Sequence, residues 1–347
     1  MVAGRAVRYV ADVPVTGGRT VLLTGGLGGA HLAPALARAL GPGNLTVVAN
    51  VGDDLDWHGL RICPDVDTVL YALGGQLDRE RGWGIAGDTF TVRAALAGLG
   101  GPSAFGVGDR DLATHLVRAE LLRTGRTLTE ATAEVARRLG VDGPAVLPAS
   151  DEPCPTRLEL ADGRWVGFQE WYVGAGAEPP VRSVAPGSGP AAPAVLAALA
   201  RADAVVLGPS NPVSSIGTVL ALDGLAEAVA RVPTVVAVSP VVLASPPPGP
   251  VAHHALARRR LLAVTGDEDT PAGVARHYAR RHPGLVDAYL VDERDGGEVP
   301  GVVRAGLCPE PARLLDPGAL AGALAGLLGA RAAAAGARGR DRGAPAA

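Results

Sequence analysis

The chain has 347 residues, 48% of them hydrophobic and 19% charged, which suffices to bury a sizeable core and excludes wholesale disorder. Its net charge of −3 lacks the basic excess of a nucleic-acid-binding surface, so no nucleic-acid partner is expected. All 32 basic residues are Arg, which excludes Schiff-base chemistry on Lys and the lysine of a P-loop.

The cysteines and the apolar runs indicate the compartment. Cys63, Cys154 and Cys308 are odd in number and form no CxxC pair, which argues against a disulfide framework and against structural zinc. No apolar run reaches the ~18 residues of a transmembrane helix, and residues 1–19 contain too many charges, glycines and prolines for a signal peptide. We therefore expect a cytoplasmic protein with no membrane partner.

The first fifty residues predict a βαβ unit. Residues 1–18 are expected to be a flexible extension, and Thr20–Leu23 are β-forming residues that predict a strand. After a glycine loop, the leucines of His31–Leu40 recur every four residues, which predicts a helix. Leu45–Asn50 is an almost continuous apolar run, typical of a strand buried on both faces of a parallel sheet.

A mainly helical insertion is expected around residues 67–150. Apolar spacing predicts helices at 67–73 and 91–99, and two more within 111–139 that Gly125 separates. That these helices form a subdomain inserted into the sheet domain is implied by a family resemblance, which rests on strings such as RGWGIAGDTF (81–90) and GVGDRDLATHLVR (106–118).

The second half of the chain returns to alternating helices and strands. Residues 157–173 predict a hairpin with an Asp-Gly turn, and the tail 331–347, rich in Ala, Gly and Arg, is expected to be disordered. The other predicted elements are helices at 194–201, 215–231 and near 270–280, and strands at Ala204–Leu207, Thr234–Ser239 and Ala288–Val291. The fold class is therefore α/β: residues 19–330 form one Rossmann-like domain, a parallel sheet with helices on both faces and the helical insertion.

Two loops at predicted strand ends are candidate phosphate-binding segments. The first, Thr24–Gly29 (TGGLGG), lies between a strand and a helix, where backbone N–H groups hold phosphates. It matches neither GxGxxG nor a P-loop, so a plain tight turn is an equal alternative. The second, Gly208–Pro212 (GPSNP), follows the strand Ala204–Leu207, and ligands of open α/β sheets bind at such strand ends.

Paired carboxylates follow the second predicted strand. Asp53 and Asp54 are adjacent, and Asp65 and Asp67 come soon after them. A hard cation that neutralises phosphate charge requires such groups. The alternative is turn and cap chemistry, in which Asp65 or Asp67 caps the following helix.

Other polar and aromatic residues also have two interpretations. Asp88 and Asp109 suit helix caps or substrate contacts, and His31 suits a phosphate contact or a solvated helix position. Trp83, between two glycines, suits a stacking surface or a lid packed on the core. A solvated helix face is expected for His253, His254 and Arg258–Arg260.

Several long strings carry a family resemblance. The most specific are GVGDRDLATHLVR (106–118) and GPSNPVSSIG (208–217), with LTGGLGGAHL (23–32) and RGWGIAGDTF (81–90) in the same order. Over about residues 20–330 the chain resembles the 2-phospho-L-lactate transferases and their actinobacterial counterparts, the phosphoenolpyruvate transferases of coenzyme F-420 biosynthesis.

This resemblance implies a Rossmann-like homodimer that uses Mg²⁺. The implied reaction joins the phosphoenolpyruvyl or phospholactyl group of a guanosine-diphosphate-linked donor to the terminal ribityl hydroxyl of 7,8-didemethyl-8-hydroxy-5-deazariboflavin (Fo), releasing GMP. The implied site residues are Gly25, Gly26, Gly28, Gly29, Ser210, Asn211, Ser214 and Ser215 for the diphosphate and guanosine; Asp67, Asp88, Thr89, Gly108 and Asp109 for the deazaflavin; and Asp53 and Asp67 for catalysis and the metal.

The chain departs from the family pattern at two places, and two alternative functions are considered. The family usually carries Lys or Arg where this chain has His31, and the segment after Pro240 also differs. A non-enzymatic regulator of the related glycine-loop family is one alternative function. A nicotinamide-dependent dehydrogenase is another, but Asn50 stands where such an enzyme has an acidic residue to hold a ribose.

Overall fold

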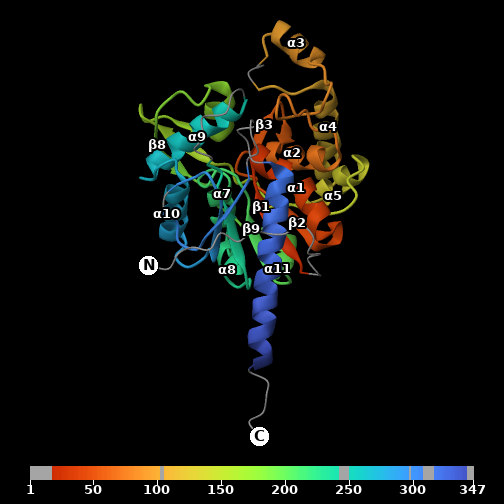
Figure 1. Ribbon diagram of the computed structural model, residues 1–347. Helices are drawn as coiled ribbons and strands as arrows, with labels where there is room; N and C mark the ends of the chain where they lie inside the picture. Colours follow the sequence, from red (N-terminus) through yellow and green to blue (C-terminus); the bar gives the residue numbers. More distant parts are fainter. Residues whose placement is uncertain (1–17, 102–104, 242–249, 297, 308–315, 342–347) are drawn as a thin grey trace.

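The computed structural model describes residues 18–101, 105–241, 250–296, 298–307 and 316–341, and Figure 1 shows their arrangement. A seven-stranded parallel sheet forms the centre of the molecule, in the order β12-β11-β10-β9-β1-β2-β5. Its strands are β1 (Thr20–Thr24), β2 (Leu45–Ala49), β5 (Ala145–Pro148), β9 (Ala204–Leu207), β10 (Val235–Val238), β11 (Ala288–Asp292) and β12 (Val302–Ala305). This flanked parallel sheet confirms the predicted α/β fold class.

The order of the strands locates the site. From β1 the chain goes outward to β2 and β5, and it then returns to β9 on the other side of β1 and continues to β10, β11 and β12. The carboxyl ends of β1 and β9 therefore meet at the point where the strand order reverses, which is where open α/β sheets bind ligands. Every residue of β1, β9, β10 and β11 is buried, which explains their apolar composition.

The helices flank this sheet. They are α1 (Gly26–Leu40), α2 (Pro64–Leu73), α6 (Pro193–Leu199), α7 (Ile216–Leu220), α8 (Leu225–Ala230), α9 (Pro250–Val264), α10 (Pro271–Arg281) and α11 (Pro317–Asp341), with a short 3₁₀ turn at Pro42–Asn44. Helix α1 packs against both α2 and α11, and α7 packs against β1 and α8. Helix α1 thus lies at the centre of the molecule with its N-terminus at the switch point (Figure 1).

The insertion lies between β2 and β5. It contains the hairpin β3 (Leu55–Trp57) and β4 (Leu60–Ile62) and the helices α2, α3 (Thr91–Gly98), α4 (Asp109–Arg123) and α5 (Leu128–Arg138). Helix α5 begins with a capping box, because Thr127 Oγ1 accepts from the N–H of Glu130 and the Glu130 side chain accepts from the N–H of Thr127. Helix α3 projects farthest from the sheet (Figure 1), and none of its residues is buried.

A second small sheet lies beyond the insertion. The predicted hairpin is formed by β6 (Arg157–Leu160) and β7 (Trp165–Gly167), and β8 (Val181–Ala185) pairs with the other edge of β6. The strand expected to continue to Tyr172 is instead a π-helix, Glu170–Gly174. Such wide turns are uncommon and occur frequently at functional sites.

Other boundaries differ from the prediction for local reasons. Helix α1 begins at Gly26 rather than His31, because the glycines form its first turn. The single helix expected over 215–231 is two helices, α7 and α8, because Gly224 adopts a left-handed conformation with φ of 75°. Strands β5, β8 and β12 had no recognised pattern in the sequence.

The C-terminal helix also corrects an expectation. Disorder was expected from residue 331, but residues 331–341 continue α11. This stretch is rich in Ala, the residue with the highest helix propensity. The predicted extension before Gly18 and the last residues, 342–347, lie outside the described residues. Among the described helices, none combines the length and apolar character needed to span a bilayer.

Candidate active site

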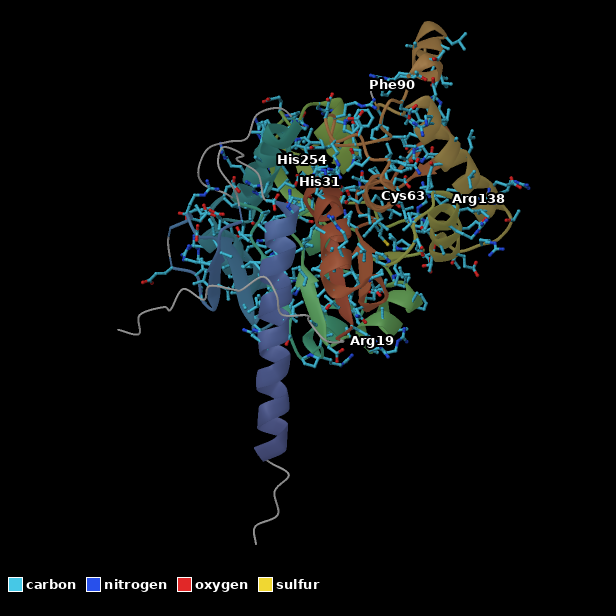
Figure 2. The ribbon with its side chains drawn as sticks, turned by 45° about the vertical axis from the view of Figure 1, so that its right-hand side comes forward. Arg19, His31, Cys63, Phe90, Arg138 and His254 are labelled. Carbon is cyan, nitrogen blue, oxygen red and sulfur yellow. The ribbon has the colours of Figure 1, made fainter. Side chains whose placement is uncertain are left out.

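One large cavity, of about 1060 Å³, opens at the carboxyl ends of β1, β2 and β9. Its wall is built from the glycine loop, the loop after β9, the start of α2, the insertion, and one face of α9. The two predicted phosphate-binding loops therefore line the same cavity, as expected from their positions at strand ends. The side chains that surround this region are drawn in Figure 2.

Close packing explains the glycines of the first loop. A Cβ on Gly28 would lie 2.3 Å from the Pro209 carbonyl oxygen, and one on Gly25 would lie 2.6 Å from Asp65 Oδ2. Gly26 has a left-handed φ of 63°. Helix α1 therefore begins directly against the loop after β9. The first-turn N–H groups of a helix have no intrahelical acceptor, so those of Leu27 and Gly28 suit an anion.

The loop after β9 is organised by its own polar side chains. Ser210 Oγ accepts from the N–H of Gly25 at 3.0 Å, and Asn211 Oδ1 accepts from the N–H of Val213 at 3.0 Å. Ser214 Oγ is buried without a hydrogen-bond partner, although Ser214 lines the cavity. An unpaired buried hydroxyl is costly, so Ser214 is suited to bind a ligand.

Three side chains form a polar cluster at the end of β2. Asn50 Nδ2 donates to Asp53 Oδ1 at 3.1 Å and to Asp65 Oδ2 at 2.9 Å. The N–H of Gly26 donates to Asp65 Oδ1 at 2.6 Å. Asp53 and Asp65 both line the cavity. The amide of Asn50 thus holds two carboxylates together beside the N-terminus of α1.

Burial makes this carboxylate pair electrostatically costly. Burial, and next the charge of Asp65, raise the pKa of Asp53 well above its usual range. Burial raises the pKa of Asp65 to about 6, against the hydrogen bonds from Asn50 and Gly26. A bound cation would relieve the repulsion between the two groups, so these residues fit a divalent metal.

Asp67 has a different partner from the one expected. It was predicted to join Asp53, but its carboxylate is bound through both oxygens by Arg118 of α4, with Nη1 to Oδ2 at 3.0 Å. Residues two apart on a helix point about 200° away from each other, so Asp65 faces Asn50 while Asp67 faces α4. The structure therefore pairs Asp53 with Asp65, which the sequence offered as a cation-binding carboxylate or a helix cap but which the family resemblance did not include among the metal residues.

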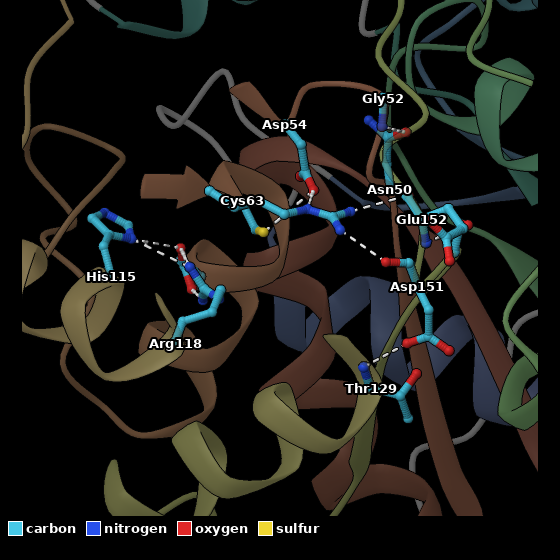
Figure 3. Close-up of polar contacts among 12 residues, drawn as sticks. Asn50, Gly52, Asp54, Cys63, His115, Arg118, Thr129, Asp151 and Glu152 are labelled. Atoms are coloured by element: carbon cyan, nitrogen blue, oxygen red, sulfur yellow. Dashed lines mark hydrogen bonds and ion pairs between the residues drawn. The ribbon is translucent and has the colours of Figure 1, made fainter. Parts of the chain in front are cut away.

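The Asp67 carboxylate belongs to a buried network that the sequence did not reveal. Tyr71 Oη donates to Asp111 Oδ1 at 2.6 Å, and His115 Nδ1 lies 3.6 Å from Asp67 Oδ2. His115 Nε2 lies 3.3 Å from the same Asp111 oxygen, and His115 lines the cavity. Figure 3 shows His115 and Arg118 side by side on α4. The sequence offered one indication of this network: His115 and Arg118 are three residues apart, which places both on the same face of a helix.

Asp54 is a structural residue. It accepts from Arg61 Nε at 3.0 Å, and the same guanidinium donates to the carbonyls of Asp151 at 2.8 Å and Glu152 at 3.1 Å (Figure 3). Burial raises the pKa of Asp54 to about 7, against the nearby charge of Arg61. This contact fixes the loop after β2, and with it the position of the neighbouring Asp53.

Asp88 and Asp109 cap each other's helices. Asp88 accepts from the N–H groups of Arg110 at 2.8 Å and Asp111 at 3.0 Å, at the start of α4. Asp109 accepts from Thr89 Oγ1 at 2.6 Å and from the N–H groups that begin α3. Of the predicted deazaflavin residues, Asp88, Thr89, Gly108 and Asp109 are not among the side chains of the cavity wall. They hold together the segments that carry Trp83 and Asp111, and these two residues do line the cavity.

Three histidines besides His115 also line the cavity. His31 is half-buried, and burial, followed by the charge of Arg79, lowers its pKa. His253 and His254 were expected on a solvated face, but both line the cavity and contact Tyr172. Their partner is far away in the sequence, so the pattern of α9 alone gave no sign of it.

The comparisons with known proteins cover most of the chain. Residues 20–297 match the family model of the 2-phospho-L-lactate transferase CofD. The phosphoenolpyruvate transferase of Kitasatospora aureofaciens is 41% identical over 306 residues, covering 86% of this chain and 92% of the relative. That of Streptomyces griseus is 42% identical over 298 residues, covering 83% and 90%.

A solved structure shares the fold at low identity. A protein of the UPF0052 family from Bacillus halodurans superposes with a TM-score of 0.60 at 17% identity, covering 89% of this chain and 99% of that one. This likeness supports the architecture alone. The family match and the relatives above 40% identity show that the chain belongs to the 2-phospho-L-lactate transferase CofD family.

Proposed function

We propose that this protein transfers the phosphoenolpyruvyl or phospholactyl group of a guanosine-diphosphate-linked donor to the terminal ribityl hydroxyl of Fo and releases GMP, in coenzyme F-420 biosynthesis. Family membership supports the class of reaction. The name of the relatives, phosphoenolpyruvate transferase, favours the enolpyruvyl donor over the lactyl one.

One observation carries this proposal. A buried carboxylate pair, Asp53 and Asp65, lies in the same cavity as the N-terminus of α1 and contacts it through the N–H of Gly26. The helix N-terminus favours an anion, whereas the carboxylates favour a cation. A diphosphate with its metal ion satisfies both requirements in one place.

Mg²⁺ fits the residues that are present. Asp53 and Asp65 would hold it, because both are buried carboxylates that Asn50 brings together. Burial raises the pKa of each, and the charge of Asp65 raises that of Asp53 further, so a cation would lower the cost of keeping both ionised. Among the described residues, no three or more His, Cys, Asp or Glu side chains lie close enough together to hold a metal ion by themselves. Mg²⁺ is commonly bound by one or two carboxylates together with substrate phosphates, and bound Mg²⁺ would neutralise developing phosphate charge.

The residues of the chain then act by positioning and by proton transfer. The Fo hydroxyl oxygen forms a bond to the phosphorus that carries the three-carbon acid, and the bond from that phosphorus to the GMP oxygen breaks. Asp53, whose carboxylate lines the cavity beside the start of α1, is suited to orient the hydroxyl and accept its proton. The N–H groups of Leu27 and Gly28 and the Ser214 hydroxyl would hold the diphosphate in line.

A product assay tests this proposal. The protein is incubated with Mg²⁺, Fo and either donor, generated in place, and the products are identified by mass spectrometry. A phosphodiester of Fo is expected, its mass identifying the acid, and Asp53→Asn should prevent its formation. The exposed hairpin residue Asp162 gives the control, Asp162→Asn, which should behave as the parent. Absence of product with both donors, in a protein that binds GDP, would favour the regulatory alternative.

A further inference from the structure

His31 lies on the face of α1 that begins at the glycine loop, near the N-terminal end of the helix (Figure 2). It follows Leu27 by four residues and Gly28 by three, so the three share one face of the helix. The imidazole lines the cavity, and its Nε2 is buried without a hydrogen-bond partner among the described residues. Because Leu27 and Gly28 offer their N–H groups to the diphosphate, this unpaired nitrogen lies about one helical turn beyond the phosphates.

A turn of the insertion carries Arg79 to the same face of α1. The Asp78 carboxylate accepts from the N–H of Arg81 and from Arg81 Nε, both at 2.9 Å, so Asp78 is bound to Arg81 rather than to Arg79. A Cβ on Gly82 would lie 3.0 Å from Leu27 Cδ2, which shows that this turn packs against the residue one helical turn before the imidazole. Arg79 lines the cavity and forms no ion pair with a described carboxylate.

The other basic groups of the cavity wall are bound elsewhere or lie farther away. Among the described residues they are Arg38, His115, His253, His254 and Arg258. Arg258 donates to a carboxylate and to a backbone carbonyl. His115 lies between two carboxylates, and His253 and His254 both bond to one tyrosine. Arg38 is exposed and lies about two helical turns beyond His31. Because the chain has no Lys, His31 and Arg79 are the basic pair left to bind an anion near the start of α1.

The charges at this position favour an anion. Burial, and next the charge of Arg79, lower the pKa of His31, so the two basic groups are close enough to repel each other. A carboxylate bound by both groups removes this repulsion, whereas an uncharged substituent of the phosphate does not.

We propose that His31 and Arg79 bind the carboxylate of the three-carbon acid that the donor carries. This assignment rests on the proposed function. In such a donor a single oxygen and a single carbon separate the phosphorus from the carboxylate, so the carboxylate lies within about one helical turn of a phosphate held at the start of α1. A guanidinium can bind a carboxylate through two N–H groups, and the imidazole adds another donor. The enolpyruvyl and lactyl donors carry this group in the same place, so the pair selects an acid over an uncharged substituent.

The binding of small phosphate esters tests this assignment without any turnover. The probes are phosphoenolpyruvate and methyl phosphate, which has no carboxylate, and ligand-observed NMR titrations with Mg²⁺ present measure their affinities. The parent should bind phosphoenolpyruvate about tenfold to hundredfold more tightly than methyl phosphate, because hydrogen bonds to a charged group contribute on that scale. Arg79→Gln and His31→Leu should each lose most of this preference. His31→Arg restores a cation and should retain it.

Two controls separate the carboxylate from the phosphate and from general electrostatics. Methyl phosphate should bind every variant as tightly as the parent, which also shows that the fold is intact. Arg38→Gln removes a charge from the same helix and should leave the preference unchanged. The assignment is overturned if the parent shows no preference, or if either Arg79→Gln or His31→Leu leaves it unchanged. It is also overturned if the preference disappears without Mg²⁺, since the metal would then hold the carboxylate. Failure of the transferase assay with the preference intact would reject the reaction and retain the carboxylate subsite.

Discussion

Both carboxylate oxygens of Asp67 in α2 are bound by the guanidinium of Arg118 in α4, and Arg118 is wholly buried. Burial is the largest single influence and would lower the pKa of Arg118, but the charge and the hydrogen bonds of Asp67, together with other neighbouring groups, raise that pKa overall. The pair joins the insertion's longest helix to the helix that carries Asp65. Asp67 thereby acts first as an anchor of the active-site wall.

Arg118→Leu should strongly destabilise the protein. It leaves the Asp67 carboxylate buried without a partner, and loss of one member of a buried ion pair costs about 3–5 kcal/mol. The free energy of unfolding in urea measures the loss. Arg123→Leu on the same helix removes an exposed pair with Glu120 and should cause no measurable change. Equal effects of the two substitutions would show that the buried pair has no special weight.

The carboxylate pair Asp53 and Asp65 should be needed for turnover although it lowers the stability of the metal-free protein. Asp53→Asn removes the repulsion with Asp65 while keeping a group that can accept from Asn50. We expect turnover to fall by about 10²-fold or more and thermal stability without Mg²⁺ to stay equal or rise. Asp65→Asn should likewise weaken the Mg²⁺ dependence of GDP binding. Lower stability together with normal turnover would make the pair structural.

Asp88→Ala separates a cap from a ligand contact. Asp88 accepts from two N–H groups at the start of α4 and is not part of the cavity wall. We expect a loss of about 0.5–2 kcal/mol in stability, with faster amide exchange at Arg110 and Asp111, and nearly unchanged Fo affinity. If Fo affinity fell sharply while amide exchange stayed the same, Asp88 would be a deazaflavin ligand, as the family resemblance implied.

His254 should make stability fall in mild acid. Its pKa in the folded protein, about 4, is below the ordinary value of 6.5, so the unfolded chain binds the extra proton between these values. The contribution of His254 is therefore present above pH 6.5 and is lost as the pH falls towards 4. The parent should lose roughly 1–2 kcal/mol more than His254→Leu between pH 7 and pH 5. Parallel stability curves for the two proteins would contradict this expectation.

Local patterns in the sequence determined much of the fold. The strand Ala204–Leu207 was predicted with its observed bounds. Strand periodicity, glycine turns and helix caps depend on neighbouring residues, so a single sequence contains them. The same reasoning placed both phosphate-binding loops at strand ends, and the structure brings them into one cavity.

Which side chains meet was decided only by the tertiary structure. Asp67 and Arg118 are 51 positions apart, and Tyr172 and His254 are 82 apart. Such contacts depend on the packing of whole elements, so spacing along one helix cannot reveal them. For this reason the sequence identified a cluster of carboxylates, whereas the turn of α2 about its axis determined that Asp65 lies beside Asp53 and that Asp67, which also lines the cavity, is bound by Arg118 of α4.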